Sequence, residues 1–409
     1  MKLATLLVLL PLRGTPIGVQ DAAAGAAAKS PGSARVLLES AGGEVKSRDL
    51  AGFSTADPRE LGARIVRFEG LAAPRAPALD EARAEVTLHG GDRLFGRLRG
   101  GRAELIDLEV TGGIHLGLAL DEIASLVFPE RIPKLGGVAP APPEEGDRIY
   151  RRAGGGLDVI DGGIEEFTTD GVRIHGESVG NKTISWSEVA ALYVEELGEG
   201  PAARAERGVP VTVDLTDGGR LRGALAGLSE EGCSIVTLNG EKVLVPLAAV
   251  ELLLVDDGEV AFLSSIAPSE APPSLPFGDD LGMRWPHRVD RSVLGGRISA
   301  AGRVRARGLG VHAPSRITWK LDGAFKHLRA LVAVDDECRR LPTPGSVVFR
   351  VFVDGQKRFE SRELHAGDPP VPTGTLDLAG AREVVLEVDP SDGSTVADRA
   401  DWIEPVLWR

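Results

Sequence analysis

Residues 308–315 read Gly-Leu-Gly-Val-His-Ala-Pro-Ser, and residues 345–355 read Gly-Ser-Val-Val-Phe-Arg-Val-Phe-Val-Asp-Gly. The second stretch is a short apolar run that ends in an Asp-Gly turn, which is typical of a buried β-strand. Between the two, residues 328–337 form another apolar run that closes on the acidic triplet Asp-Asp-Glu. The sequence Asp-Trp-Ile-Glu-Pro follows at 401–405. Together these stretches predict strands joined by tight turns in the last third of the chain.

In this order the four stretches resemble the NPCBM module, the carbohydrate-binding type first noted on glycoside hydrolases of family 98. The family pattern reads roughly G-x-G-x-H-A-x-S, V-x-V-D-D, G-S-V-x-F-x-V-x-x-D-G and D-W-x-x-P, and each block has its match here. The resemblance covers residues 276–409. It implies a jelly-roll β-sandwich that binds sugars, with a bound calcium in some members.

Four residues are candidates for carbohydrate binding. Trp285 lies in a polar loop, where its ring could stack on a sugar face or be buried instead. His312 could bond a sugar hydroxyl, but a structural histidine held by a carboxylate is the favoured alternative. Asp401 and Trp402 complete the set, although Trp402 is also expected to pack between the sheets. Trp319 alternates with apolar neighbours on one strand face and is expected in the core.

The acidic triplet offers the oxygen ligands that calcium prefers. Its members Asp335, Asp336 and Glu337 could be joined by Asp398 and Asp401 if the first and last strands meet. Calcium takes roughly six to eight oxygen donors, so backbone carbonyls or further acids would have to contribute. The alternative is a solvated acidic turn, neutralised by the two arginines at 339–340. The sequence therefore allows a structural calcium site without requiring one.

A sequence repeat precedes this region. The hairpin pattern Val-x-Leu, a Gly-rich turn and Leu-x-Gly-x-Leu occurs at 86–98 and again at 213–225. The offset of 127 residues then persists without a gap as far as Leu126 and Leu253. Alternation with a period of two predicts strands with one buried face, so each copy must curl up or pack on a neighbour.

The whole chain therefore predicts an all-β protein. The copies resemble small SH3-like or Sm-like barrels, and the jelly-roll sandwich follows them. The expected β repeats and the sandwich lie at 33–70 (degenerate), 84–128, 147–196 (divergent), 208–256 and 276–409. Joints rich in Pro, Gly or Ala are expected at 71–79, 129–146, 198–208 and 269–276. The last joint is expected to divide the chain into two structural units.

Residues 1–26 resemble a secretory signal, with Lys2 ahead of an apolar run at 3–12 and Ala-rich cleavage sites. That run is too short to span a bilayer, and no stable membrane span is expected.

The chain has 60 acidic and 47 basic residues and a net charge of −13, which disfavours nucleic acid as a partner. Cys233 and Cys338 lie in different expected domains and among apolar residues, so both are expected to pack rather than pair.

These features predict a secreted or periplasmic, non-enzymatic protein whose sandwich binds a glycan and is displayed on the repeats. No segment remains for a (β/α)-barrel catalytic domain, which takes about 250 residues. The main alternative is a cell-envelope scaffold whose sandwich has lost its sugar affinity and contacts an envelope protein partner. An unrecognised hydrolase is a third hypothesis.

Overall fold

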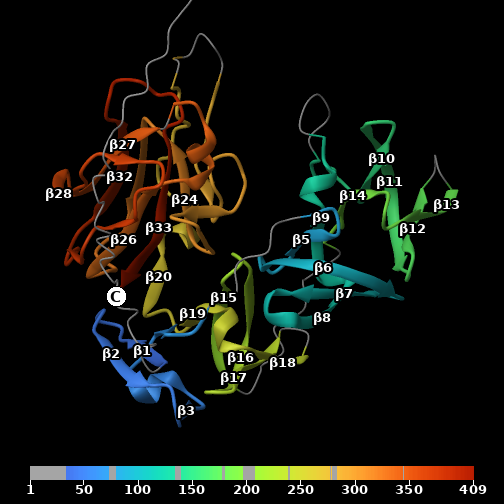
Figure 1. Cartoon of the computed structure of the whole chain (residues 1–409), viewed down its shortest axis with the longest axis horizontal. Coiled ribbons are helices and arrows are strands. Elements are labelled where there is room, and N and C mark those ends of the chain that lie inside the picture. Colours follow the sequence, from blue (N-terminus) through green and yellow to red (C-terminus); the bar gives the residue numbers. More distant parts are fainter. Residues whose placement is uncertain are drawn as a thin grey trace, which may run out of the picture. The chain divides into compact units, whose positions relative to one another are not determined.

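The computed structural model describes residues 34–72, 80–133, 140–176, 180–196, 208–237, 240–276, 278, 283–343 and 345–409. The expected signal at 1–26 lies outside these residues, as do parts of the joints at 71–79, 129–146 and 198–208. Antiparallel strands dominate the described chain (Figure 1), so the predicted all-β class is confirmed. No helix in the described ranges is long and apolar enough to cross a membrane.

The two in-phase copies are five-stranded sheets with the same strand order, β8-β7-β6-β5-β9 and β18-β17-β16-β15-β19. The earlier copy comprises β5 (Arg83–Leu88), β6 (Arg93–Arg102), β7 (Leu105–Val110), β8 (Ile114–Ala119) and β9 (Ile123–Val127). The later copy comprises β15 (Val209–Leu215), β16 (Arg220–Ser229), β17 (Gly232–Thr237), β18 (Lys242–Val245) and β19 (Val250–Val255).

The register of the two copies agrees residue for residue. Val86 pairs with Leu126, and Val213 pairs with Leu253, which are the positions 127 residues further on. In both copies the ladder shifts immediately afterwards, before Leu88 and before Leu215. A β-bulge is a local irregularity, so its occurrence at corresponding positions shows that the two segments have the same backbone pairing. Neither segment contains a helix where a strand was expected.

Two further groups of strands complete the first part of the chain. Residues 147–193 form β10 (Asp147–Ala153), β11 (Gly156–Phe167), β12 (Gly171–Gly176), β13 (Gly180–Ser185) and β14 (Val189–Tyr193). Residues 35–69 form β1 (Arg35–Glu39), β2 (Val45–Asp49), β3 (Ser54–Thr55) and β4 (Ile65–Glu69). The copies join in pairs through their last strands, because β9 pairs with β14 and β19 with β4. The results are a ten-stranded and a nine-stranded sheet.

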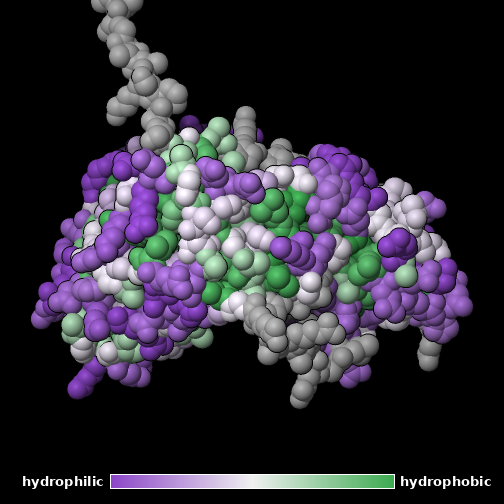
Figure 2. All heavy atoms as spheres, turned by 90° about the horizontal axis from the view of Figure 1, so that it is seen from below, coloured by the Kyte–Doolittle hydropathy of each residue, from purple (hydrophilic) through white to green (hydrophobic). Residues whose placement is uncertain are grey.

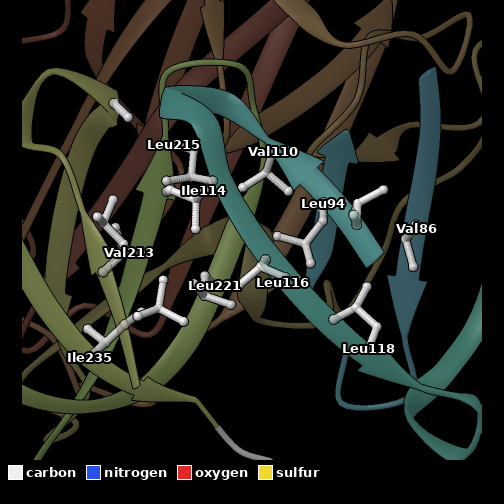
Figure 3. Packing of buried hydrophobic residues seen from close by; sticks show 14 of the residues in the cluster. Val86, Leu94, Val110, Ile114, Leu116, Leu118, Val213, Leu215, Leu221 and Ile235 are labelled. Atoms are coloured by element: carbon white, nitrogen blue, oxygen red, sulfur yellow. The ribbon is translucent and has the colours of Figure 1, made fainter. Parts of the chain in front are cut away.

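The 83–127 and 209–255 copies share one hydrophobic core. Figure 3 shows Leu116 of the earlier copy beside Leu221 of the later copy, and Ile114 beside Leu215. All four side chains are almost fully buried. Neither sheet could bury this apolar face alone, so the contact between the copies supplies much of the hydrophobic stabilisation. The face drawn in Figure 2 is correspondingly hydrophilic over much of its area, with hydrophobic residues in separate patches.

The C-terminal region is a sandwich of two antiparallel sheets. One sheet contains β20 (Val260–Phe262), β21 (Arg288–Val289), β24 (Gly308–His312), β26 (His327–Val334), β30 (Val371–Pro372), β31 (Leu376–Asp377) and β33 (Arg399–Trp408). The other contains β25 (Ser315–Lys320), β27 (Ser346–Val353), β28 (Gln356–Glu360), β29 (Leu364–His365) and β32 (Glu383–Pro390). Outside the two sheets, β22 (Ile298–Ala300) and β23 (Arg303–Arg305) form a separate hairpin. Trp319 and Trp402 are buried in the core between the sheets, as expected.

Short 3-10 turns connect several strands. They are η1 (Pro58–Leu61), η2 (Thr111–Gly113), η3 (Leu120–Glu122), η4 (Pro129–Arg131), η5 (Leu247–Ala249), η6 (Leu263–Ser265) and η8 (Asp336–Arg340). The two cysteines, Cys233 and Cys338, are buried and free, as the sequence predicts. Burial raises the pKa of each thiol to about 12, so both remain protonated and pack as small hydrophobic groups.

Ion pairs link the sandwich to the preceding copies. Arg307 pairs with Asp214, which also pairs with Arg220 at 2.9 Å. Arg220 reaches Asp290 as well, at 2.9 Å. The joint expected at 269–276 is itself held by hydrogen bonds, for example from the Ser269 amide to a carbonyl of β25. The independence of a C-terminal unit stays a prediction, and any such unit would have to fold without these buried ion-pair partners.

Candidate carbohydrate-binding site

The motif Gly-Leu-Gly-Val-His forms the strand β24 (Gly308–His312). A Cβ atom on Gly308 would lie 2.5 Å from the Trp402 carbonyl oxygen, and one on Gly310 would lie 2.3 Å from the Arg291 carbonyl oxygen. Both glycines therefore permit close backbone approach, on one side by β33 and on the other by residues 291–293. This packing fixes the edge of the sandwich where the candidate site lies.

Trp285 and His312 lie against each other at this edge. Their ring centroids are 4.9 Å apart, and the ring planes are inclined by 38°. The backbone of Trp285 is held by two hydrogen bonds of 2.9 Å to Ser274, and its side chain is half-buried. His312 is buried, with Nδ1 2.8 Å from the carbonyl oxygen of Ala313. A backbone carbonyl thus holds the imidazole, where the sequence analysis expected a carboxylate.

Two charged side chains border the Trp285–His312 pair. Arg399 is the β33 residue opposite His312, and its guanidinium carbon lies 5.9 Å from the centre of the Trp285 ring. Its Nη1 is 3.9 Å from Oε1 of Glu337, and the Ser292 hydroxyl donates to Oε2 of Glu337 at 3.2 Å. The buried atoms Arg399 Nε and Glu337 Oε1 have no hydrogen-bond partner among the described residues. The guanidinium of Arg399 and the carboxyl group of Glu337 therefore lie close together beside the Trp285 ring.

Burial changes the pKa values of two residues in this cluster, His312 and Glu337. Burial lowers the pKa of His312, so its imidazole is neutral near pH 7. Burial, followed by the negative charge of Asp335, raises the pKa of Glu337 to about 7. A neutral histidine with Nδ1–H donating to a carbonyl leaves Nε2 as a hydrogen-bond acceptor. The cluster therefore offers an aromatic face, one fixed cation and two groups that can accept hydrogen bonds.

Asp335 and Asp401 form a buried pair next to the cluster. Asp401 is fully buried on β33, and neither of its carboxyl oxygens has a hydrogen-bond partner among the described residues. Burial, followed by the negative charge of Asp335, raises the pKa of Asp401 well above its usual range. Burial of this kind favours the neutral form of a carboxyl group. Asp401 is thus a structural residue that a sugar cannot reach.

The acidic side chains proposed for calcium accept hydrogen bonds from backbone amides. The two oxygens of Asp335 accept the amides of Glu337 and Ser299, at 2.8 and 3.1 Å. Asp336 accepts the Gly302 amide at 2.6 Å, and Asp398 accepts the amide of residue 346 at 2.9 Å. Across the described ranges no three His, Cys, Asp or Glu side chains are grouped so that they could hold a metal ion. The triplet is not a solvated turn either, because Asp335 is buried and caps η8.

Of the four candidate sugar-binding residues, the structure brings Trp285 and His312 together. Asp401 and Trp402 are at most 1% exposed inside β33 and are removed from the candidate site. The sequence analysis missed Arg399 altogether and proposed Glu337 only as a metal ligand. A signal for Arg399 was available: it lies two residues before the Asp-Trp block, so it shares a strand face with Asp401.

A two-sheet antiparallel sandwich with an aromatic and charged cluster at its edge is the architecture of a β-sandwich binding module. Residues 266–408 match the family model NPCBM/NEW2 domain, and this is a family of binding modules. The resemblance seen in the sequence is therefore confirmed, and the match begins at residue 266 rather than 276.

Solved structures of CBM51 modules are similar to this chain. The CBM51-2 and INT domains of Clostridium perfringens ZmpB are 24% identical over 37% of this chain and 31% of that chain, with a TM-score of 0.32. CBM51 from Clostridium perfringens GH95, in complex with methyl-galactose, is 22% identical over 36% of this chain and 99% of that chain, with a TM-score of 0.32. The tandem CBM51 modules of a Streptococcus pneumoniae family 98 glycoside hydrolase are 12% identical over 65% and 88% of the two chains, also at 0.32.

This chain thus spans about a third of the first of these structures. None of the curated proteins matches it.

Proposed function

We propose that the chain binds a carbohydrate at the cluster of Trp285, His312, Arg399 and Glu337. The observation that carries the proposal is the half-buried Trp285 ring, 4.9 Å from His312 and bordered by an arginine and a carboxyl group. A sugar has an apolar C–H face and a rim of hydroxyls, so it needs an aromatic surface beside hydrogen-bonding groups. The match of residues 266–408 to a family of binding modules supports the same function.

Each residue would have a distinct role. Trp285 would stack on the sugar ring, and His312 would hold the indole in place from behind. Arg399 would donate hydrogen bonds from its guanidinium, and Glu337 would accept one from a hydroxyl; charge-assisted bonds of this kind are stronger than neutral ones. In its ionised form Glu337 is the better acceptor, so sugar affinity should rise as pH increases through about 7.

We propose binding without catalysis. Glycoside hydrolysis uses two carboxyl groups that flank the scissile bond. In the cluster only Glu337 is placed to meet a sugar, since Asp335 is bonded to backbone amides and Asp401 is inaccessible. Export to the periplasm or the cell exterior is part of the proposal and rests on the sequence of residues 1–26. Fractionation of cells that express the full chain, with N-terminal sequencing of the mature protein, tests export.

The binding test applies the full chain to a glycan array and measures the best glycan by calorimetry. Trp285→Ala should weaken binding by about tenfold, because an aromatic contact of this kind contributes about 1 kcal/mol or more. Met283→Ala is the matched control, since Met283 is an exposed residue of the same loop. Equal loss in both variants would contradict a stacking role for Trp285.

Two other outcomes would overturn the proposal. Absence of glycan binding by the folded full chain would favour the alternative, an envelope scaffold that binds a protein partner. Release of free sugar from a bound glycan would show that the chain is a hydrolase.

A further inference from the structure

The copy at 35–69 has fewer strands than the copies at 83–127, 147–193 and 209–255. Counted from the last strand of each copy, the strand orders begin β9-β5-β6, β14-β10-β11, β19-β15-β16 and β4-β1-β2. Two more strands follow β6, β11 and β16, whereas β2 is the outermost strand of its sheet (Figure 1). After β2 the chain forms β3, which pairs with β16. Among the described strands, β2 therefore has a partner on one side only.

The hydrogen bonds of the β1–β2 hairpin show which backbone groups of β2 face outward. At one end the Ser40 amide donates to the Glu44 carbonyl oxygen at 2.9 Å. At the other end the Leu50 amide donates to the Ala34 carbonyl oxygen, also at 2.9 Å. Hydrogen-bonded and non-hydrogen-bonded residue pairs alternate in an antiparallel ladder. Counting inward from either end gives the same result: the backbone groups of residues 46 and 48 point toward β1.

The intervening residues Val45 and Ser47 therefore direct their N–H and C=O groups away from β1. Neither residue has a hydrogen-bond partner in the part of the chain that the structure describes. All five residues of β2 are exposed. An exposed row of backbone donors and acceptors can pair with an extended segment of another chain. The outer edge of β2 can thus accept one added strand.

Two cations lie along this edge. Lys46 and Arg48 are exposed, and neither has an ion-pair partner among the residues that the structure describes. They lie opposite Leu38 and Val36 of β1, so their side chains are on the same face of the sheet. In an antiparallel strand added to β2, the residues opposite these cations would form non-hydrogen-bonded pairs, with Cα atoms about 4.5 Å apart. Opposite charges in such pairs are stabilising and like charges are destabilising.

The cations distinguish between two kinds of partner. Pairing two copies of β2 along their whole length would place Lys46 of each copy opposite Arg48 of the other. That repulsion disfavours a dimer through this edge, and basic residues commonly protect edge strands in this way. A strand with acidic residues at alternate positions would instead place a carboxylate opposite each cation. The same two charges therefore disfavour self-association and favour an acidic strand.

We propose that β2 binds an extended acidic segment of another protein as an added antiparallel strand, with carboxylates opposite Lys46 and Arg48. The added strand would occupy the position next to β2 that β7, β12 and β17 occupy next to β6, β11 and β16. β2 belongs to the nine-stranded sheet, whereas the Trp285–His312 pair belongs to the sandwich. The protein segment and the sugar should therefore bind independently.

Two short labelled peptides test the charge preference. One has the sequence Thr-Glu-Val-Glu-Thr-Glu-Val-Glu, and the other has lysine in place of every glutamate. Each is titrated with the full chain at physiological salt, where charges more than about 8 Å away are largely screened, and binding is followed by fluorescence anisotropy. We expect the glutamate peptide to bind at least about fivefold more tightly. Equal affinity for the two peptides, or binding of neither, would overturn the proposal.

A proline substitution tests the backbone pairing. Ser47→Pro removes an N–H group that points outward, and edge strands tolerate proline at such positions because no bond to the neighbouring strand is lost. It should weaken binding of the glutamate peptide at least about tenfold, since the proline ring also obstructs the approaching strand. Ser47→Ala keeps the N–H group and should bind as the wild type does. Equal affinity in the two variants would contradict strand addition at β2.

A charge reversal tests the same site without altering the backbone. The double variant Lys46→Glu/Arg48→Glu should prefer the lysine peptide over the glutamate peptide. Lys242→Glu is the control, because Lys242 is exposed on β18 at the other edge of the same sheet, and it should keep the wild-type preference. Wild-type preference in the double variant would overturn the proposal. So would a dimer in analytical ultracentrifugation that Ser47→Pro abolishes, because the strand bound at β2 would then be a second copy of this chain.

Discussion

The 83–127 and 209–255 copies share strand order, register and bulges, yet they present different side chains at corresponding positions. The later copy has the acidic residues Asp214 and Glu251 where the earlier copy has Thr87 and Ala124. Both acids are buried or nearly so, and both pair with arginines of the sandwich. The backbone pairing therefore does not depend on whether these positions have acidic or uncharged side chains. It depends on the apolar residues between them, which have the same period in both copies.

The earlier copy contacts the sandwich through a different position. Its buried Glu85 pairs with Arg291, whereas the later copy has Thr212 at the corresponding position. Arg291 thus pairs with the earlier copy, while Arg305 and Arg307 pair with the later copy. The comparison teaches that the apolar residues of each sheet set the strand register, whereas the charged residues differ according to which part of the sandwich each copy contacts. The following predictions test this distinction, from the largest expected effect to the smallest.

Asp214→Ala should destabilise the protein by about 3–5 kcal/mol, because it leaves the buried Arg307 and Arg220 without their shared carboxylate. Although burial opposes ionisation, the two arginines lower the pKa of Asp214, so the carboxylate is charged across the neutral range. The corresponding change in the earlier copy, Thr87→Ala, should cost less than about 1 kcal/mol. Urea unfolding of both variants measures the difference. Equal destabilisation would show that the copies do not differ in this role.

The carboxyl group of Glu337 should make stability depend on pH. Its pKa is about 7 in the folded protein, above the usual value for glutamate, so the folded state retains a proton that the unfolded state has lost. The contribution of Glu337 to stability therefore falls as pH rises from about 4.5 to about 7. Glu337→Gln should leave stability nearly unchanged at pH 5 and raise it at pH 8, by on the order of 1–3 kcal/mol.

Unfolding free energies of wild type and Glu337→Gln at the two pH values check this prediction. A difference between the proteins that does not change with pH would contradict it. Glu231→Gln in the later copy is the control. The Glu231 side chain is exposed, so we expect this variant to show no pH-dependent difference in stability from the wild type.

Glu85→Gln should destabilise the protein by about 1 kcal/mol, because its partner Arg291 is partly exposed and can be rehydrated. The change at the corresponding position, Thr212→Ala, removes a hydroxyl that donates to Asp256 at 2.6 Å and should have a similar, small effect. Thermal melting of the two variants beside Asp214→Ala ranks the contacts. A loss of several kcal/mol in Glu85→Gln would show that the earlier copy is the main anchor of the sandwich.

Calcium should have the smallest effect. A specific site would stabilise the protein by about 2.7 kcal/mol at a hundredfold excess of calcium over the dissociation constant. We expect no shift between calcium and chelator in melting curves of the full chain, because Asp335, Asp336 and Asp398 already accept backbone amides. A rise in melting temperature with calcium, lost in Asp336→Asn, would restore the calcium hypothesis.

Several features followed from the sequence alone, because they depend on local pattern. Period-two alternation identified the strands of the 83–127 and 209–255 copies, and the constant offset of 127 residues identified their equivalence. The four motif blocks identified the sandwich. The same alternation placed Trp319 in the core, where the structure has it. Burial of one strand face is a property of neighbouring residues, so it can be seen before the fold is known.

The site was decided by tertiary structure. Trp285 and His312 come from different segments of the chain, and Arg399 and Glu337 join them from two other segments. The sequence analysis proposed Asp401 as a sugar-binding residue because of its place in a motif, yet the structure buries it completely. Periodicity indicates which face of a strand is buried, but it does not reveal which distant side chains meet there. Those contacts depend on how the sheets pack, and only the folded chain determines that.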